Sequence, residues 1–257
     1  MVNKLRNFWP PAAVLGAFVI LWQAVVILFH IEPYILPSPL AIASNTIEQT
    51  PRLLHHTWST LGVTLLGFMA GTAAGFVLAA LLHVIPGAKA GFYPLLVLTQ
   101  NVPVIALGSL LVVWFGFGIL PRLILIILVC FFPVVVAMLT GLTQSDPKLV
   151  DYMKMIGATK GRLFWRLELP NAVPYLFSGL KIAASYSVIS AIYAESIGGS
   201  EGLGNFMLVS QRGWQTANVF SAIAIIVVLS LILFGLISLA EQFLVRGGSR
   251  KPEKGRG

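Results

Sequence analysis

Six long, almost uncharged stretches restrict this chain more than any other feature of its sequence. A helix rises about 1.5 Å per residue, so roughly 20 apolar residues cross the hydrocarbon core of a bilayer. The stretches run from Pro11 to Phe29, Trp58 to Leu82, Phe92 to Phe115, Leu123 to Leu142, Pro174 to Ile197 and Ala217 to Ala240. The pattern predicts an all-α, polytopic membrane protein with six transmembrane helices.

The composition excludes a soluble domain. Hydrophobic residues make up 57% of the 257 residues and charged residues only 10%, whereas soluble domains carry about 25% charged residues. The fifth stretch gives the weakest signal, because Lys181 and Glu195 interrupt it.

Basic residues predict the orientation of the spans, because they collect in cytoplasmic loops. If the N-terminus is inside, the outside keeps only Arg52, Arg122 and Arg212, a split of 14 to 3 among the 17 basic residues. The inner ones are Lys4, Arg6, Lys89, Lys148, Lys154, Lys160, Arg162, Arg166, Lys181, Arg246, Arg250, Lys251, Lys254 and Arg256. We therefore expect both termini to be cytoplasmic. The same rule accounts for the net charge of +8 without a nucleic-acid partner.

The first stretch is predicted to be a retained helix rather than a cleaved signal. Lys4 and Arg6 precede it as in a secretory signal, but the run from Pro11 to Phe29 exceeds a typical signal core. In addition, no small-x-small cleavage site closes the run.

The connector after the first stretch contains three prolines between residues 33 and 39, which prevent a continuous helix. Apolar residues at helical spacing from Leu40 to Ile47 predict a short helix on the outer face. His55 and His56 follow, and without a third ligand nearby we interpret them as interfacial rather than metal-binding. The single cysteine, Cys130, excludes an intramolecular disulfide and a cysteine cluster.

The longest predicted inner loop, residues 143–173 (loop 143–173 below), contains signals for the start and end of a helix. Ser145 or Asp146 can cap a helix whose first residue is Pro147, where the missing N–H costs nothing. Gly157 is placed to end this helix in a left-handed turn.

The first helix of this loop is amphipathic. Leu149, Met153 and Ile156 share one face, with Tyr152 alongside. This helix would therefore expose apolar side chains in the cytoplasm.

A second short helix is predicted to begin near Thr159, carry Leu163, Phe164 and Leu167, and stop before Pro170. The helix pair would expose apolar side chains, which is costly without a partner. Two interpretations stay open: a protein docking surface, or a helix pair that lies along the membrane.

The spacing in this loop resembles the coupling loop of ATP-binding-cassette (ABC) importer permeases. That loop has Glu-Ala-Ala, three residues, Gly, nine residues and Ile-x-Leu-Pro. Here the segment from Asp151 to Met153 is followed by three residues, Gly157, nine residues and the segment from Leu167 to Pro170. The departures lie at the start, where Asp151 replaces Glu and bulkier Tyr152 and Met153 replace the alanines.

The resemblance continues through PSPLAI, QNVPVIALGSLLVVWFGFG, PNAVPYLFSGLKIAASYSVISAIYAESIGGSEGLG and the final helix. The chain is similar to the branch serving nitrate, taurine and aliphatic sulfonate importers. YLFSGLKIAASYSVI and EGLG most resemble permeases for the thiamine pyrimidine precursor or riboflavin. The resemblance therefore implies import of a small polar solute.

The resemblance also implies a domain division and a set of partners. Residues 1–57 would form an N-terminal helix and external connector, residues 58–245 a five-helix importer core with loop 143–173, and residues 246–257 a basic cytoplasmic tail. A second permease copy, two cytoplasmic ATPase subunits and an extracytoplasmic binding protein would complete an assembly in the bacterial inner membrane. The implied ATPase contacts are Asp151, Tyr152, Met153, Ile156, Gly157, Leu167 and Pro170.

ATP hydrolysis is expected on the partner. The sequence contains no Gly-x4-Gly-Lys-Ser/Thr phosphate loop. We therefore expect this chain to be no enzyme and to bind no cofactor, with ATP and Mg²⁺ held by the ATPase subunit.

Two amides occur deep in the third predicted span. Gln100 and Asn101 lie about 14 Å from its start, near the midplane, and Pro103 follows. A proline there frees a carbonyl that a polar group must satisfy. The amides either line a pathway or gate, or repair the kink and hold helices together.

Glu195 is a further pathway or gate candidate. It lies about 32 Å past Pro174, near the outer boundary, where it either contacts a partner or another helix or is a solvated helix end. We favour the solvated end. Lys181 is expected to extend to water near the inner end, and the glycines from Gly198 to Gly204 predict an external turn.

Two other functional classes fit the sequence less well. A stand-alone carrier or channel would move solute without an ATPase, but duplicated halves are not visible. A membrane-embedded enzyme would need clustered catalytic groups, which the few intramembrane ionisable residues do not supply.

Overall fold

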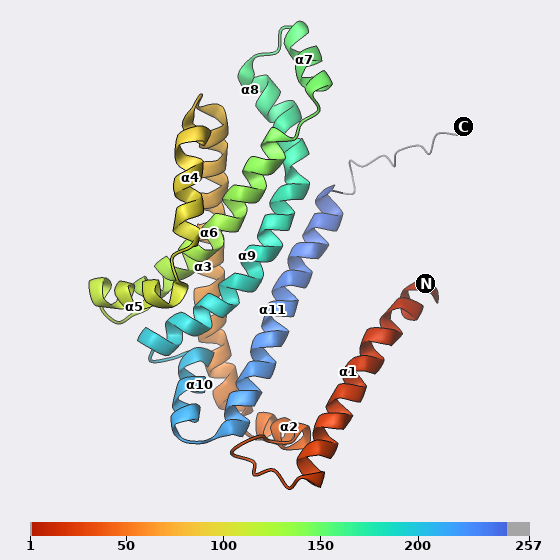
Figure 1. Ribbon diagram of the computed structural model, residues 1–257, viewed down its shortest axis with the longest axis vertical. Helices are drawn as coiled ribbons and strands as arrows, with labels where there is room; N and C mark the ends of the chain where they lie inside the picture. The colour runs from red at the N-terminus through yellow and green to blue at the C-terminus, as the bar shows by residue number, and fades with distance from the viewer. Residues whose placement is uncertain (1, 246–257) are drawn as a thin grey trace.

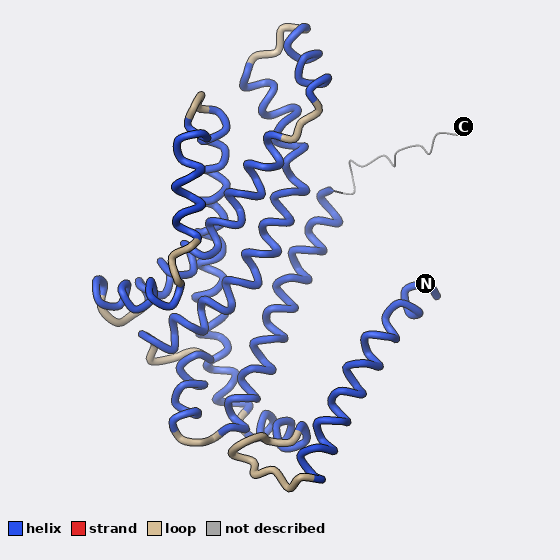
Figure 2. The backbone as a smooth tube through the Cα atoms, in the orientation of Figure 1, coloured by secondary structure: helices blue, strands red, loops and turns tan. Residues whose placement is uncertain are grey.

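The computed structural model describes residues 2–245 and the side chains from Trp9 onward. The predicted basic tail, 246–257, lies outside this range. Every regular element within the described part of the chain is a helix (Figure 2). The elements are α1 Val2–Leu28, α2 Pro39–Glu48, α3 Thr50–Val84, α4 Ala88–Gln100, α5 Val104–Phe115, α6 Ile119–Thr143, α7 Pro147–Met155, α8 Lys160–Leu163, the π-helical turn η1 Phe164–Glu168, α9 Leu169–Gly198, α10 Leu203–Arg212 and α11 Thr216–Val245.

The number of membrane spans agrees with the sequence prediction. Five helical segments are long and apolar enough to cross a bilayer: α1 from Trp9, α3, α6, the continuous run Lys160–Gly198 and α11. The pair α4 and α5 makes a sixth span if it is counted as one. The chain is a multi-pass membrane protein.

The third predicted span, Phe92 to Phe115, is not one continuous helix. It is broken between α4 and α5, and the two halves meet at an angle of 92°. Pro103 is the N-cap of α5. Its ring restricts the preceding residue away from helical geometry, and its missing N–H interrupts the hydrogen-bond ladder. The sequence signalled a kink, and the structure has a complete break.

The helices α3, α6 and α9 form the centre of the bundle, with α11 alongside α9 (Figure 1). Glycines allow their close approach. A Cβ on Gly71 of α3 would lie 2.7 Å from the Ile127 carbonyl oxygen, and one on Gly179 of α9 would lie 2.7 Å from the Ala137 Cβ. Small residues every fourth position on α3, at Gly67, Gly71 and Gly75, therefore let its backbone pack against α6.

Short helices occupy the two ends of the bundle (Figure 1). α7 and α8 lie at one end, called the α7 end below, and α2 and α10 lie at the other, the α10 end. The predicted short helix after the connector is α2, whose Asn45 donates to Asn218 Oδ1 at 2.8 Å and to Ser221 Oγ at 3.0 Å. The sequence interpretation missed α10.

The helix α1 leans away from the rest of the bundle and approaches it near α2 (Figure 1). At that end Leu40 N donates to Gln23 Oε1 at 3.3 Å, and the Trp22 ring lies 5.5 Å from that of Phe220. Its side chains from Trp9 to Leu21 are exposed in the single chain.

Candidate functional site

Loop 143–173 begins with the helix start that its sequence predicts. Asp146 is the N-cap of α7, and its carboxylate accepts a hydrogen bond from Lys148 N at 2.9 Å. Pro147 follows as the first helical residue. The cap satisfies one of the free N–H groups at the helix start, so α7 is held at its first turn.

The end of α7 is a Schellman motif centred on Gly157. Gly157 has φ +78° and its N–H donates to the Lys154 carbonyl at 3.0 Å. Ala158 N donates to the Met153 carbonyl at 2.9 Å. These two bonds define the motif, and they confirm the predicted left-handed turn.

The helix α7 presents apolar side chains at the tip of the molecule. Leu149 is 49% exposed, Tyr152 57%, Met155 78% and Ile156 60%. Leu149, Tyr152 and Ile156 occupy one face at helical spacing, and Met153 is half-buried instead of joining them. No residue of α7 is buried in the chain.

The second half of the loop departs from the predicted short helix. Thr159 caps α8 by accepting from Arg162 N at 3.3 Å, as expected. Pro170 does not stop the helix, however, because α8 continues through η1 into α9. Pro170 lies in the first turn of α9, directly after the π-helical turn η1. A proline is tolerated in the first turn of a helix. Leu167 lies in η1 and is half-buried.

Gln100, Asn101 and Pro103 lie at the break between α4 and α5. Asn101 is the C-cap of α4, and its Nδ2 donates to the Val97 carbonyl at 2.9 Å. This bond satisfies a carbonyl of the last turn of α4, whereas the Thr99 carbonyl, four residues before Pro103, accepts from Val102 N at 3.3 Å. All three residues are exposed in the single chain, which leaves the pathway interpretation open as well.

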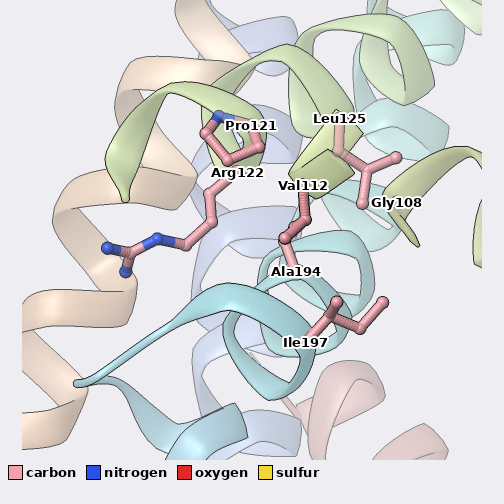
Figure 3. Close-up of a pocket in the computed structure, with 7 residues that line it drawn as sticks. All are labelled: Gly108, Val112, Pro121, Arg122, Leu125, Ala194 and Ile197. Carbon is pink, nitrogen blue, oxygen red and sulfur yellow. The ribbon is translucent and has the colours of Figure 1, made fainter. Parts of the chain in front are cut away.

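A small pocket lies beside α5, near the α10 end (Figure 3). It is lined by residues of α5, α6 and α9: Gly108, Val112, Pro121, Arg122, Leu125, Ala194 and Ile197. The Arg122 side chain extends away from the others in Figure 3, and its Nε donates to the Gly118 carbonyl at 2.8 Å. The lining is mainly apolar, so this pocket offers no set of polar groups for a solute.

Glu195 is fully buried, so the favoured prediction of a solvated helix end is wrong. Its Oε2 accepts from Thr60 Oγ1 at 2.9 Å and from Gly204 N at 3.0 Å. Thr60 Oγ1 in turn accepts from Leu203 N at 2.8 Å. The carboxylate joins α9, α3 and the start of α10, and the helix end is closed because the turn folds back over it.

The external turn predicted at the glycines fits around this carboxylate. A Cβ on Gly202, which has φ +104°, would lie 2.2 Å from the Glu195 carboxyl carbon. One on Gly204 would lie 2.0 Å from the Ile192 carbonyl oxygen. Both positions therefore require glycine.

Two partly buried polar pairs were missed because they join residues far apart in the sequence. Lys181, expected to extend to water, is 24% exposed and pairs with Glu241 of α11. His83, at the end of α3, lies 2.8 Å from Glu168 of η1. Neither pair has a periodic signal in the sequence, because its two members lie on different helices.

The predicted site residues form two separate groups. Asp151, Gly157 and their neighbours gather in loop 143–173 at the α7 end (Figure 1). Gln100, Asn101 and Pro103 lie at the helix break, and Glu195 is held by residues at the start of α10. Loop 143–173 and the break between α4 and α5 therefore lie in different parts of the bundle (Figure 1).

Comparisons with known proteins match most of the chain. The family described as "Binding-protein-dependent transport system inner membrane component" matches residues 64–246. A probable ABC transporter permease of Haemophilus influenzae is 35% identical over 91% of this chain and 96% of its own length. The formylaminopyrimidine transport permease ThiX of Halalkalibacterium halodurans is 34% identical over 83% of this chain and 86% of its own.

A solved structure supports the fold. A chain from inward-facing forms of the methionine ABC transporter MetNI aligns with a TM-score of 0.61 at 22% identity. The alignment covers 79% of this chain and 99% of the other. At this identity the likeness is one of architecture.

Proposed function

Since this chain belongs to the family of binding-protein-dependent transport system inner-membrane components, we propose that it forms the translocation pathway of an ABC importer and that loop 143–173 docks on the ATPase subunit. The chain is the permease subunit and not an enzyme, and ATP hydrolysis lies in a separate subunit. The pathway, the docking contacts and the cargo are the proposed parts.

The observation that carries the docking role is the exposed apolar face of α7. Leu149, Tyr152 and Ile156 are each about half exposed or more, and the cap at Asp146 and the turn at Gly157 fix their backbone. A rigid apolar face at the end of a bundle fits a groove on a partner, since a rigid element loses little entropy on binding. Asp151, Met153, Leu167 and Pro170 complete the proposed docking segment.

We place loop 143–173 and both termini on the cytoplasmic side. Five basic residues occur in α7, α8 and the turns next to them, at one end of the bundle: Lys148, Lys154, Lys160, Arg162 and Arg166. Basic residues favour the cytoplasmic side of a membrane.

Thiol labelling tests this orientation in a Cys130→Ser background. Lys160→Cys should react with impermeant reagents only from the cytoplasm, and Glu48→Cys of α2 only from outside, because both side chains are exposed. The reverse pattern would reject the orientation.

The proposed assembly contains two copies of this chain, two ATPase subunits and an extracytoplasmic binding protein. Apolar side chains are exposed beyond loop 143–173 as well, for example Val113, Trp114 and Phe117 near the end of α5. A second copy or lipid would cover such surface. ATP and Mg²⁺ would be bound by the ATPase subunits.

For cargo we propose a small polar solute of the formylaminopyrimidine class. The support is the 34% identity to ThiX over most of both chains. Riboflavin, sulfonate, taurine and nitrate are the other solutes implied by the sequence resemblance, and a binding assay on the partner binding protein separates them. Gln100, Asn101 and Pro103 are the proposed pathway or gate residues.

Reconstitution tests the function. The permease should import formylaminopyrimidine into proteoliposomes only with its ATPase, its binding protein and ATP present on the correct sides. Uptake by the permease alone would instead support a stand-alone carrier. Co-purification tests the docking segment directly. The unsubstituted permease should retain the ATPase, and a variant with a disrupted α7 should lose it.

A further inference from the structure

The last turn of α3 contacts the π-helical turn of loop 143–173 through two side chains. His83 Nε2 lies 2.8 Å from Glu168 Oε2. A carboxylate only accepts hydrogen bonds, so the imidazole nitrogen is the donor. The two side chains are 17% and 15% exposed, and a mostly buried contact of this kind is weakly screened by salt.

An aromatic side chain of the same turn anchors it in the bundle. Phe164 is 9% exposed, and its ring centroid lies 6.2 Å from that of His83. It belongs to one apolar cluster with Leu82 of α3, Leu96 of α4 and Leu142 of α6. Neither α7 nor α8 contains a buried residue, so η1 is where the loop meets the packed helices.

Two routes lead from this turn into the bundle. One is covalent, because η1 continues directly into α9. The other crosses from Glu168 to His83 at the end of α3, and α3 turns after Ile85 into α4. Leu96 of α4 packs in the cluster that holds Phe164, and α4 ends at the 92° break.

The π-helical turn gives this contact a defined register. In η1 the Leu169 N–H donates to the Phe164 carbonyl, five residues back. A π-turn holds one residue more than an α-turn, so a change between them rotates the neighbouring side chains by about 100°. Glu168 faces His83 in the register seen here, and the hydrogen bond favours that register.

We propose that His83 and Glu168 are positioning residues that carry a displacement of loop 143–173 to α3, α4 and the helix break. The proposal rests on the proposed docking of this loop on an ATPase. This contact and transmission through α9 alone predict different results when the His83 donor is lost. Loss of the His83 donor should leave ATPase binding intact and weaken the response of the break to nucleotide.

The experiment measures both quantities on the whole complex in nanodiscs. Val102 lies between α4 and α5 and is 45% exposed. Val102→Cys in a Cys130→Ser background reports on the break through its rate of labelling by a fluorescent maleimide, with and without ATP and vanadate. Retention of the ATPase subunit is measured on the same samples. Two variants are made in the reporter background. His83→Leu removes the hydrogen-bond donor to Glu168, and His83→Gln restores an amide donor.

The matched control is Glu241→Leu. It removes the acceptor of another mostly buried pair, Lys181 with Glu241, which joins α9 to α11 away from η1. A general loss of bundle packing would affect both sites. A specific role in transmission would affect the His83 variant alone.

We expect His83→Leu to retain the ATPase while the nucleotide-dependent change in labelling rate falls roughly 2- to 30-fold, the range for residues that modulate coupling. His83→Gln should recover most of the response, and Glu241→Leu should keep it. A full response in His83→Leu, or an equal loss in Glu241→Leu, would overturn the proposal. If His83→Leu does not assemble, Glu168→Leu, which removes the acceptor, is judged by the same criteria.

Failure of the underlying function gives a different result. If the unsubstituted permease does not retain the ATPase, the proposed docking is wrong. If it retains the ATPase and His83→Leu responds normally, docking stands and the transmission contact is wrong.

Discussion

Gly157 offers the sharpest test of the docking segment, because its substitution isolates a backbone effect. Its φ is +78°, in the left-handed region, and a Cβ built there meets nothing within 4 Å. Side-chain clashes therefore do not contribute. Any effect must come from the conformation that the Schellman motif requires.

The magnitude follows from the cost of that conformation. The left-handed region costs an L-residue about 1–2 kcal/mol, and strained backbone at such sites costs up to about 3 kcal/mol. Valine should lie at the upper end because it is β-branched, whereas asparagine tolerates the left-handed region. At about 1.4 kcal/mol per tenfold, Gly157→Val should reduce the docking-competent fraction roughly 5- to 150-fold.

The assay is the affinity of the purified ATPase subunit for the permease in nanodiscs. Gly157→Val should raise the Kd by that factor while the thermal stability of the spans stays unchanged, because α7 contains no buried residue. Gly157→Asn is the matched control and should bind nearly as the unsubstituted chain does. The reasoning is refuted if the Val variant binds within a factor of about two of the unsubstituted chain, or if both variants weaken binding equally.

Three further substitutions test the bundle. Gly71→Ala should lower the free energy of unfolding in detergent by about 1–3 kcal/mol, because the added methyl overpacks against α6. Gly62→Ala, whose Cβ would meet nothing within 4 Å, should be neutral. Equal effects of the two substitutions would reject the close-packing argument. Glu195→Leu should cost about 1–3 kcal/mol for each buried donor that it leaves unpaired. Glu201→Leu, on the turn that follows α9 and 56% exposed, should not carry this cost. Asn101→Leu should lower transport in proteoliposomes with assembly intact, and a loss of thermal stability instead would assign the amide to kink repair.

Local signals in the sequence were sufficient for α7. The start of α7 depends on Asp146 and Pro147, and its end on Gly157, and each acts within a few residues of its own position. Spans were likewise predictable from length and apolar content, because the bilayer imposes one dimension on every crossing helix.

Features that depend on contacts between distant segments were not predictable. Pro170 signals a helix stop, but it occurs in the first turn of α9, where a missing N–H is tolerated after a π-turn. Glu195 resembles a solvated helix end until the turn at Gly202 and the hydroxyl of Thr60 close over it. A single sequence does not show which residues on other helices supply these partners.

The two missed glutamate contacts together constrain how the bundle can move. Glu168 pairs with His83 at one end of the α3 and α9 pair, and Glu195 accepts from Thr60 at the other. The two positions on α3 are about 35 Å apart at 1.5 Å per residue, so the helices are tied across most of a bilayer and should move as one body. A displacement imposed at loop 143–173 should therefore reach both helices together. Tyr193 Oη of α9 donates to the Ile105 carbonyl in the first turn of α5 at 3.1 Å, so the joint motion should pass to α5 directly after the 92° break.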